Sequence, residues 1–226
     1  MIFPFFATLI IFCIWLAYEI KKSNRKSEKA EEAFWDKEAR ANATRAKSLD
    51  DLHYIVIPED VLNILKEFNN LYPKSVEIPD HRIKDVQDAY SHLSECKIVN
   101  FSNISNTDLK LMYGAANLPT LTLYDQNFIL MIRTLQTAAE YFREHSENTK
   151  AKQLLEFAIA SGSDSMNTYK LLSEIYKEEN DSSKINYLIS SASLLNSITK
   201  GPIVSYLQEQ APADSTDEES ILDILD

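Results

Sequence analysis

Four histidines and two cysteines are the side chains of this sequence best suited to bind a metal ion or to act as nucleophiles. His92 and Cys96 are four residues apart, so on a helix they would face the same direction and offer two zinc ligands. Zinc usually takes three or four ligands, and the nearest acidic residues, Asp85 and Asp88, precede His92 by two turns and one turn. A surface histidine beside a partly buried cysteine explains the pattern more simply. We therefore expect no metal ion and no cofactor.

Asp80 and His81, followed by Asp85, form the other group that could transfer protons. Charged residues are common at helix starts, however, and the sequence contains neither an HExxH nor a GxSxG motif. The three glycines lie far apart, whereas a phosphate-binding loop needs several close together. The sequence thus predicts no catalytic residues and a protein that is not an enzyme, although an enzyme with an unrecognised site is an alternative.

The charge balance indicates which partners the chain could have. Lysine and arginine number 23 against 34 acidic residues, which gives a formal net charge of -11. Such a charge argues against general binding to nucleic acid, because the phosphate backbone would be repelled. Hydrophobic residues make up 45% of the chain, so most of it can fold.

The segment Ile2–Tyr18 contains no charged residue. As a helix it would extend about 26 Å, close to the ~30 Å core of a bilayer. Trp15 and Tyr18 lie near its end, where amphipathic rings prefer the membrane interface. The basic residues come after this segment and not before it: Lys21, Lys22, Arg25 and Lys26. The pattern predicts a single-pass anchor over 2–18 with the N-terminus outside and the body in the cytoplasm. A cleaved signal peptide fits less well, since the basic n-region and small-residue cleavage site are missing.

Four further regions follow the anchor, which we place at 1–18, and the third of them, 125–210, consists of helical hairpins. Residues 19–47 are charged and helix-prone, with Phe34 and Trp35 at the centre of a thin apolar stripe, and form a stalk or a docking helix. Residues 48–124 form a middle region, partly helical and partly irregular, with a short extended segment at His53–Ile57. Residues 211–226 form an acidic tail that we expect to be disordered.

Apolar residues at helical spacing and cap signals predict a mainly α fold. In the middle region the expected helices are Asp60–Leu71, Arg82–Cys96 and Asp108–Tyr113, with Pro119 marking a break. Asp80 is the expected cap of the second of these helices, and Gly114 closes the third. From 125 to 210 the pattern is one of helical hairpins: Gln126–His145, Thr149–Ser161, Ser165–Glu179, Ser182–Leu195, with Asp181 as its cap, and Pro202–Gln210.

A shared offset of 34 residues links the first two of these hairpins. Leu135, Ala138 and Phe142 match Tyr169, Leu172 and Tyr176, and Leu155 and Ala158 match Ile189 and Ala192. The pattern resembles the tetratricopeptide repeat, with small residues where helices pack closely and an aromatic residue between hairpins. The units are 132–165, with Ala139 and Ala151, and 166–199, with Ser173 and Ile185. Ile185 departs from the family's small residue, and the usual proline is replaced by Ser163 and Ser197. This resemblance implies an α-solenoid in which Phe142 and Tyr176 are buried at equivalent places.

In the tetratricopeptide family the first helix of each hairpin forms the concave, partner-binding surface. Carried over by position, this candidate groove is Arg133, Gln136, Glu140, Arg143, Asn167, Lys170, Glu174 and Lys177. With four basic and two acidic side chains it would suit an acidic peptide or a C-terminal carboxylate. An ordinary solvated helix face is the alternative.

The whole arrangement also resembles single-pass membrane proteins of clostridial bacteria, through the stretches FWDKEARANATRAK and SNTDLKLMYGAANLP and the repeats that follow. This resemblance implies a bacterial inner-membrane protein and carries no activity. The function expected from the sequence is a membrane-anchored cytoplasmic adaptor or scaffold that binds a protein or peptide. A structural subunit of a membrane complex is the alternative.

Overall fold

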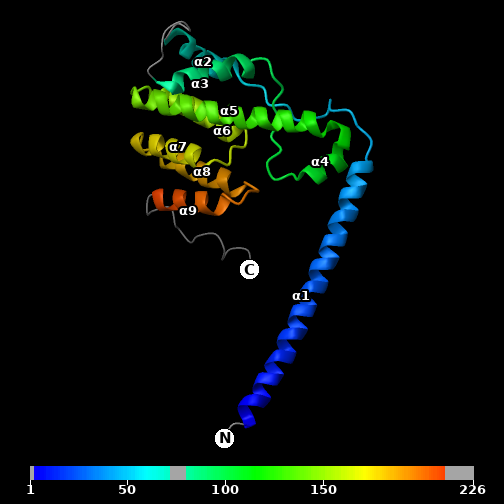
Figure 1. The fold of residues 1–226 in the computed structure, drawn as a ribbon. Coiled ribbons are helices and arrows are strands. Elements are labelled where there is room, and N and C mark those ends of the chain that lie inside the picture. The colour runs from blue at the N-terminus through cyan, green and yellow to red at the C-terminus, as the bar shows by residue number, and fades with distance from the viewer. Residues whose placement is uncertain (1–2, 72–79, 212–226) are drawn as a thin grey trace, which may run out of the picture. The chain divides into compact units, whose positions relative to one another are not determined.

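The computed structural model describes residues 3–71 and 80–211, and this part of the chain is mainly helical, as predicted (Figure 1). It contains no strand within the described residues. The helices are α1 (Phe3–Ala43), α2 (Glu59–Leu71), α3 (His81–Leu93), α4 (Asn106–Tyr113), the 3-10 turn η1 (Ala115–Asn117), α5 (Leu118–Glu144), α6 (Asn148–Ala160), α7 (Met166–Glu178), α8 (Ser182–Ser193) and α9 (Lys200–Gln210). The acidic tail lies outside the described residues, apart from Ala211.

The chain divides into two compact units, which consist of residues 1–50 with 104–119 and of residues 51–103 with 120–226. The first unit contains α1, α4 and η1. The predicted middle region is thereby divided, because its residues 104–119 belong with the N-terminal helix.

In the first unit, α4 packs against the last turns of α1 mainly through polar groups. Glu38 accepts a hydrogen bond of 2.7 Å from the Thr107 hydroxyl and is ion-paired with Lys110. A second ion pair, 2.6 Å long, joins Lys37 to Asp108. The buried apolar side chains at this contact are few, the chief ones being Ala41 and Leu109.

Gly114 allows the chain to turn closely after α4. Its φ of +93° lies in a region that other residues avoid, and an added Cβ would approach the Arg45 carbonyl oxygen to 2.4 Å. The backbone groups beside it are shared with the end of α1: Lys47 donates to the Tyr113 carbonyl at 3.0 Å, and Ala115 donates to the Thr44 carbonyl at 3.3 Å. The sequence correctly predicted Gly114 as the end of this helix.

The apolar part of α1 is solvent-exposed. Its exposed side chains include Phe6, Leu9, Ile10, Ile11, Phe12, Ile14, Trp15, Leu16, Tyr18 and Ile20. A search of the described residues finds no helix that combines the length and the apolar character needed to span a bilayer. Ile2, the first residue of the predicted anchor, lies outside the described residues, as do the side chains of Phe3, Pro4, Phe5 and Ala7.

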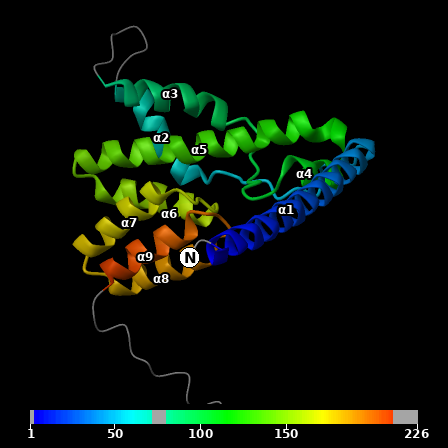
Figure 2. The same cartoon turned by 60° about the horizontal axis from the view of Figure 1, so that its bottom comes forward.

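In the second unit, α2 and α3 form a helical hairpin, and α5 to α9 follow one another in chain order (Figure 1). Figure 2 shows α9 beside both α7 and α8 at the end of this series. Helix α7 packs on α6, α8 and α9, so it contacts α9 although α8 lies between them in the sequence. Aromatic rings join the hairpin to α5, because Phe68 lies 5.1 Å from Tyr141 and 5.2 Å from Phe142 between ring centroids. These contacts belong to one apolar core that runs through the unit.

The positions that share the 34-residue offset lie in this core. Thirteen of the sequence-predicted repeat positions are buried: Leu135, Ala138, Ala139, Phe142, Ala151, Leu155, Ala158, Tyr169, Leu172, Ser173, Tyr176, Ile185 and Ala192. Ile189 is half-buried. The predicted burial of Phe142 and Tyr176 is confirmed, with 2% and 1% of each residue exposed.

Several predicted boundaries differ from the structure. Helix α5 begins at Leu118 and not near Gln126, because Pro119 occupies the first turn, where its missing N–H is not needed. Helix α4 begins two residues before the predicted Asp108, with Ser105 as N-cap accepting from the Asp108 N–H at 3.1 Å. Helix α3 ends at Leu93 and not at Cys96. The predicted extended segment at 53–57 is not a strand, although the Ile55 N–H donates to the Ile98 carbonyl at 2.9 Å.

Candidate functional site

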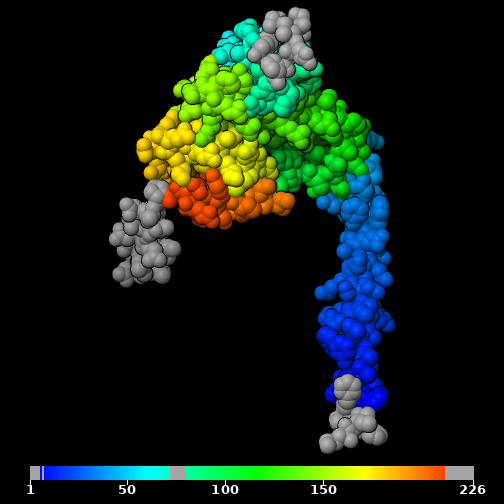
Figure 3. Space-filling model, turned by 60° about the vertical axis from the view of Figure 1, so that its left-hand side comes forward, coloured from blue at the N-terminus to red at the C-terminus, as the bar shows by residue number. Residues whose placement is uncertain are grey.

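The eight residues of the predicted groove lie on α5 and α7, and most of them take part in contacts between helices. Arg133, Asn167, Lys170 and Lys177 are exposed, whereas Gln136, Glu140, Arg143 and Glu174 are half-buried. We call these eight residues the α5–α7 polar face. Helix α7 also lies beside α9, and the surfaces of these two helices, yellow and red, adjoin each other (Figure 3).

Side chains of α5 hold the start of α7. The Gln136 amide donates to the hydroxyls of Ser165 at 2.5 Å and of Thr168 at 2.6 Å. Thr168 is fully buried, so this bond satisfies a hydroxyl that water does not reach. One turn further along α5, Glu140 accepts a hydrogen bond of 2.6 Å from the Asn167 amide. Gln136 and Glu140 therefore position α7, and their polar atoms are already engaged.

Arg143 has the most contacts of the eight. Its guanidinium lies 2.9 Å from a carboxylate oxygen of Glu174 and 2.9 Å from one of Glu178, and it donates to the Leu171 carbonyl at 3.1 Å. Two carboxylates thus neutralise Arg143, one of the two arginines of the predicted groove. Glu178 was missed by the sequence analysis. Its spacing of four residues from Glu174, which places both on one side of α7, could have indicated it.

The same face continues from α7 to α9. The Lys170 ammonium lies 5.3 Å from the centroid of the Tyr206 ring, a cation–π contact. Lys177 donates to the side-chain oxygen of Gln210 at 2.6 Å. Both lysines remain exposed, so their contacts leave room for hydrogen bonds to another molecule. Tyr206 and Gln210 extend the face beyond the residues that the sequence predicted.

The face can therefore offer hydrogen bonds and charge to a partner, but its positive character is weaker than the sequence suggested. Arg133, Lys170 and Lys177 are the exposed cations of the eight, because Arg143 is half-buried and paired. Glu140 and Glu174 lie among them. Three exposed cations spread over two helices suit a carboxylate-bearing segment better than a compact anion such as phosphate.

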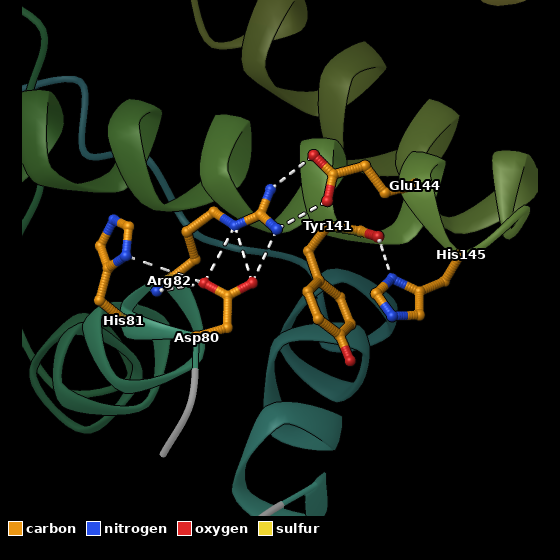
Figure 4. Close-up of polar contacts among 6 residues, drawn as sticks. All are labelled: Asp80, His81, Arg82, Tyr141, Glu144 and His145. Atoms are coloured by element: carbon orange, nitrogen blue, oxygen red, sulfur yellow. Dashed lines mark hydrogen bonds and ion pairs between the residues drawn. The ribbon is translucent and has the colours of Figure 1, made fainter.

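A second polar cluster joins the start of α3 to the end of α5 (Figure 4). Arg82 bridges two carboxylates, with nitrogen–oxygen distances of 2.7 Å to Asp80 and 2.6 Å to Glu144. The Asp80 side chain also accepts the Arg82 N–H at 2.9 Å and so caps α3, as the sequence predicted. His81 is nearby, 3.9 Å from Asp80, and His145 bonds to the Tyr141 carbonyl at 2.8 Å.

The electrostatics of this cluster favour a structural role. The hydrogen bonds from Arg82 lower the pKa values of Asp80 and Glu144 and raise the pKa of the guanidinium itself. Both carboxylates therefore stay ionised at neutral pH, where a general acid would have to be protonated. Asp80 and Glu144 act as counter-ions of Arg82 and fasten α3 to α5.

The other residues considered for chemistry are separated by the fold or bound to neighbours. The His92 ring lies 2.8 Å from the Asn127 side-chain oxygen, and the Asn127 amide donates to the Lys97 carbonyl at 2.9 Å. Burial raises the pKa of the Cys96 thiol, which makes it a poorer nucleophile at neutral pH. Within the part of the chain that the structure describes, no three acidic, histidine or cysteine side chains gather in a metal-binding group.

Comparison of the chain with protein-family models, with curated proteins and with solved structures finds no match.

Proposed function

We propose that the chain is a membrane-anchored adaptor whose α5–α7 polar face binds a protein or peptide partner in the cytoplasm. The observation that carries the proposal is the exposure of Lys170 and Lys177 on a face whose other side chains are held in place by hydrogen bonds between helices. Such a preorganised surface loses little conformational freedom when a partner binds, and this favours affinity.

The membrane anchor is supported by the exposed apolar side chains of α1 between Phe6 and Ile20. A helix that is apolar on all sides requires an apolar environment on all sides. We propose that residues 2–18 cross the membrane and that the basic residues after Tyr18 keep the following chain in the cytoplasm.

The repeat interpretation is supported by which residues are buried. Aromatic side chains separated by the 34-residue offset, Phe142 and Tyr176, fill the core, and small residues such as Ala138 and Ala158 lie where helices meet. We propose that α5 to α8 form two hairpins of the tetratricopeptide type. In this arrangement α9 would cover the second hairpin, because a stack of only two repeats leaves an apolar end.

A structural subunit of a membrane complex is the second candidate, and one observation favours it. Phe34 and Trp35 on α1 are 52% and 59% exposed and pack against each other edge to face, with ring centroids 5.3 Å apart. Two exposed aromatic rings in a charged helix form a small contact surface for a neighbouring protein. In this case the partner would bind α1 and not the α5–α7 polar face.

Site-specific photo-crosslinking in native membranes can distinguish the two candidates. A photoreactive amino acid replaces Asn167 on the polar face, Trp35 on α1 or, as a control, Ser190 on α8, all three being exposed. An adaptor of the proposed kind gives an adduct of defined mass from position 167 and none from 190.

The decisive step is charge reversal at the lysines next to the probe. Lys170→Glu with Lys177→Glu should abolish the adduct from position 167, since an acidic partner would then meet like charge. Lys66→Glu with Lys84→Glu, at exposed sites on α2 and α3, introduces the same charge change and should leave it intact. Adducts from position 35 alone would favour the complex subunit and overturn the adaptor.

A further inference from the structure

The helical geometry of α1 gathers five basic side chains on one face directly after the apolar segment. Lys21, Lys22, Arg25, Lys26 and Lys29 line one shallow hollow together with Tyr18. At about 100° per residue these six positions fall within about 140° of the helix circumference. All five basic residues are exposed. We call them the basic face of α1.

The opposite side of the same turns carries no charge. By the same geometry it contains Ile20, Ser23 and Ser27, all of them exposed. Lysines that only kept a helix soluble, or only fixed its orientation in a membrane, would work equally well on every side. The one-sided arrangement therefore indicates a surface that faces something anionic.

The charges of this face are largely uncompensated within the described part of the protein. Lys22 pairs with Glu19 at 3.2 Å and lies 5.9 Å from the centroid of the Tyr18 ring. The described residues supply no ion-pair partner to the other four basic side chains of the face. Like charges at this spacing repel one another, so the face gains stability when an anionic surface approaches.

We propose that the basic face of α1 binds the headgroups of anionic phospholipids. This inference rests on the proposed membrane anchor, because continuity with the exposed apolar segment is what selects a lipid surface over an acidic protein. The apolar residues up to Tyr18 end where the basic face begins, so a helix inserted that far has its first lysines at headgroup level.

Distances along the helix explain why one side is used. Lys29 lies about 16 Å beyond Tyr18 along the axis, whereas the headgroup layer is only about 5–8 Å thick. An upright helix would carry Lys29 past that layer. A helix that leans toward its basic face brings Lys26 and Lys29 down to within a Debye length of the phosphates, about 8–10 Å, which their long side chains can bridge. The uncharged side then faces away from the membrane.

The test uses the full chain in phosphatidylcholine vesicles with a trace of dansyl-labelled lipid. The Trp35→Phe background leaves Trp15 as the sole tryptophan donor, three residues before Tyr18. Energy transfer to dansyl-phosphatidylglycerol is compared with transfer to dansyl-phosphatidylcholine. One basic residue near an anionic surface increases the affinity for that surface about fivefold. At low salt the anionic probe should therefore be enriched around the helix at least several-fold over the neutral probe. This enrichment should disappear in about 1 M salt, where screening reduces the Debye length to ~3 Å.

Variants then locate the effect. Replacing all five basic residues of the face with glutamine should make the two probes equal. A control variant loses five positive charges at exposed sites elsewhere and should leave the enrichment unchanged. Its substitutions are Arg45→Gln, Lys47→Gln, Lys66→Gln, Lys84→Gln and Lys200→Gln. A swap variant keeps the net charge but moves two charges to the other side: Lys22→Ser with Ser23→Lys, and Lys26→Ser with Ser27→Lys. It should lose most of the enrichment.

Each result that contradicts the proposal has its own meaning. Equal transfer to both probes in the unmodified chain, or full enrichment in the glutamine variant, overturns lipid binding by this face. Full enrichment in the swap variant shows that charge number and not its placement is what counts, which also overturns it. Absence of transfer to either probe, together with failure of the chain to float with the vesicles, shows instead that the anchor itself is wrong.

Discussion

In the first unit, α4 meets α1 through ion pairs and hydrogen bonds centred on Glu38, whereas in the second unit the helices meet through buried apolar side chains. Ion pairs that water still reaches contribute about 0–1 kcal/mol each, because solvation of the two partners competes with their attraction. Burying a single large apolar side chain contributes about 1.5–3 kcal/mol. The two units should therefore respond to different perturbations, the first to changes of charge and backbone geometry and the second to lost packing.

The largest expected effect is the loss of packing in the second unit. Phe142→Ala removes a ring that is 2% exposed, contacts Phe68 and lies beneath the Lys150 ammonium, 5.0 Å from its centroid. Removal of a buried phenylalanine ring usually destabilises by about 3–5 kcal/mol, since a cavity remains. Urea denaturation of the full chain in detergent, followed by circular dichroism, measures the change.

A matched control for this variant is Ile198→Ala, which removes apolar atoms from a residue that is 97% exposed. It should shift the free energy of unfolding by no more than about 0.5 kcal/mol. Hydrogen exchange of the α4 amides should also stay unchanged in Phe142→Ala if the units unfold independently. An unaltered midpoint for Phe142→Ala would mean that this ring is not packed as described.

The next largest effect concerns the first unit and acts through the backbone. Gly114→Ala places a Cβ where the Arg45 carbonyl oxygen lies 2.4 Å away and forces a side chain into a φ of +93°. Such strain costs about 1–3 kcal/mol by conformation alone, and the clash adds to it. We expect α4 to lose hydrogen-exchange protection while the urea midpoint of the second unit is retained.

Gly201→Ala serves as the comparison, because an added Cβ there meets nothing within 4 Å. It should be neutral or slightly stabilising, as a helical glycine replaced by alanine gains propensity. If both glycine variants behave alike, the close approach at Gly114 is not what holds α4 to α1.

The sequence predicted what depends on local pattern and missed what depends on pairing across the fold. Helical periodicity predicted Phe142 and Tyr176 as core residues, and Asp80 and Asp181 as helix caps, and the structure bears this out. Pro119 was misread as a break because proline is also favoured in the first turn of a helix.

Long-range polar contacts leave no such trace in one sequence. The ion pair between Glu38 and Lys110 joins residues 72 positions apart, so no spacing rule connects them. Likewise, the resemblance to the tetratricopeptide repeat placed Arg143 in the same candidate groove as Lys177 but could not indicate that Glu174 and Glu178 neutralise it. The positive charge available on the predicted groove was therefore overestimated.

A smaller effect is expected from the polar cluster of the second unit that joins α3 to α5. Asp80→Ala removes both the N-cap of α3 and the ion pair with Arg82, at a cost of about 1 kcal/mol, mostly from the cap. Asp80→Asn keeps a capping oxygen but removes the charge, so the difference between the two variants isolates the cap. Urea denaturation resolves both. Equal destabilisation by the two substitutions would show that the ion pair, and not the cap, is what matters at this position.

The smallest effect, and the one most specific to the first unit, is acid sensitivity of the contact between α4 and α1. Hydrogen bonds from Lys110 and, to a smaller extent, from Thr107 lower the pKa of the Glu38 carboxyl below 4.5. Hydrogen bonds with Lys37 and, to a smaller extent, with Ser105 lower the pKa of the Asp108 carboxyl below 3.8. A carboxyl whose pKa is lowered on folding stabilises the folded state above its unfolded pKa, and this stabilisation is lost as pH falls through its folded pKa. Protection of the α4 amides should thus be constant near neutral pH.

Below pH 4.5 that protection should decline several-fold, after correction for the intrinsic exchange rate, while the amides of α7 serve as the reference within the same sample. The α7 amides suit this purpose because that helix packs through buried residues such as Tyr169 and Ile175. The variant Glu38→Gln with Asp108→Asn should show weaker protection of α4 at pH 7 and almost no further loss on acidification. A decline of equal size in this variant would show that other carboxylates cause the acid effect. The acid sensitivity of the first unit would then not distinguish a contact stabilised by ion pairs from one stabilised by apolar packing.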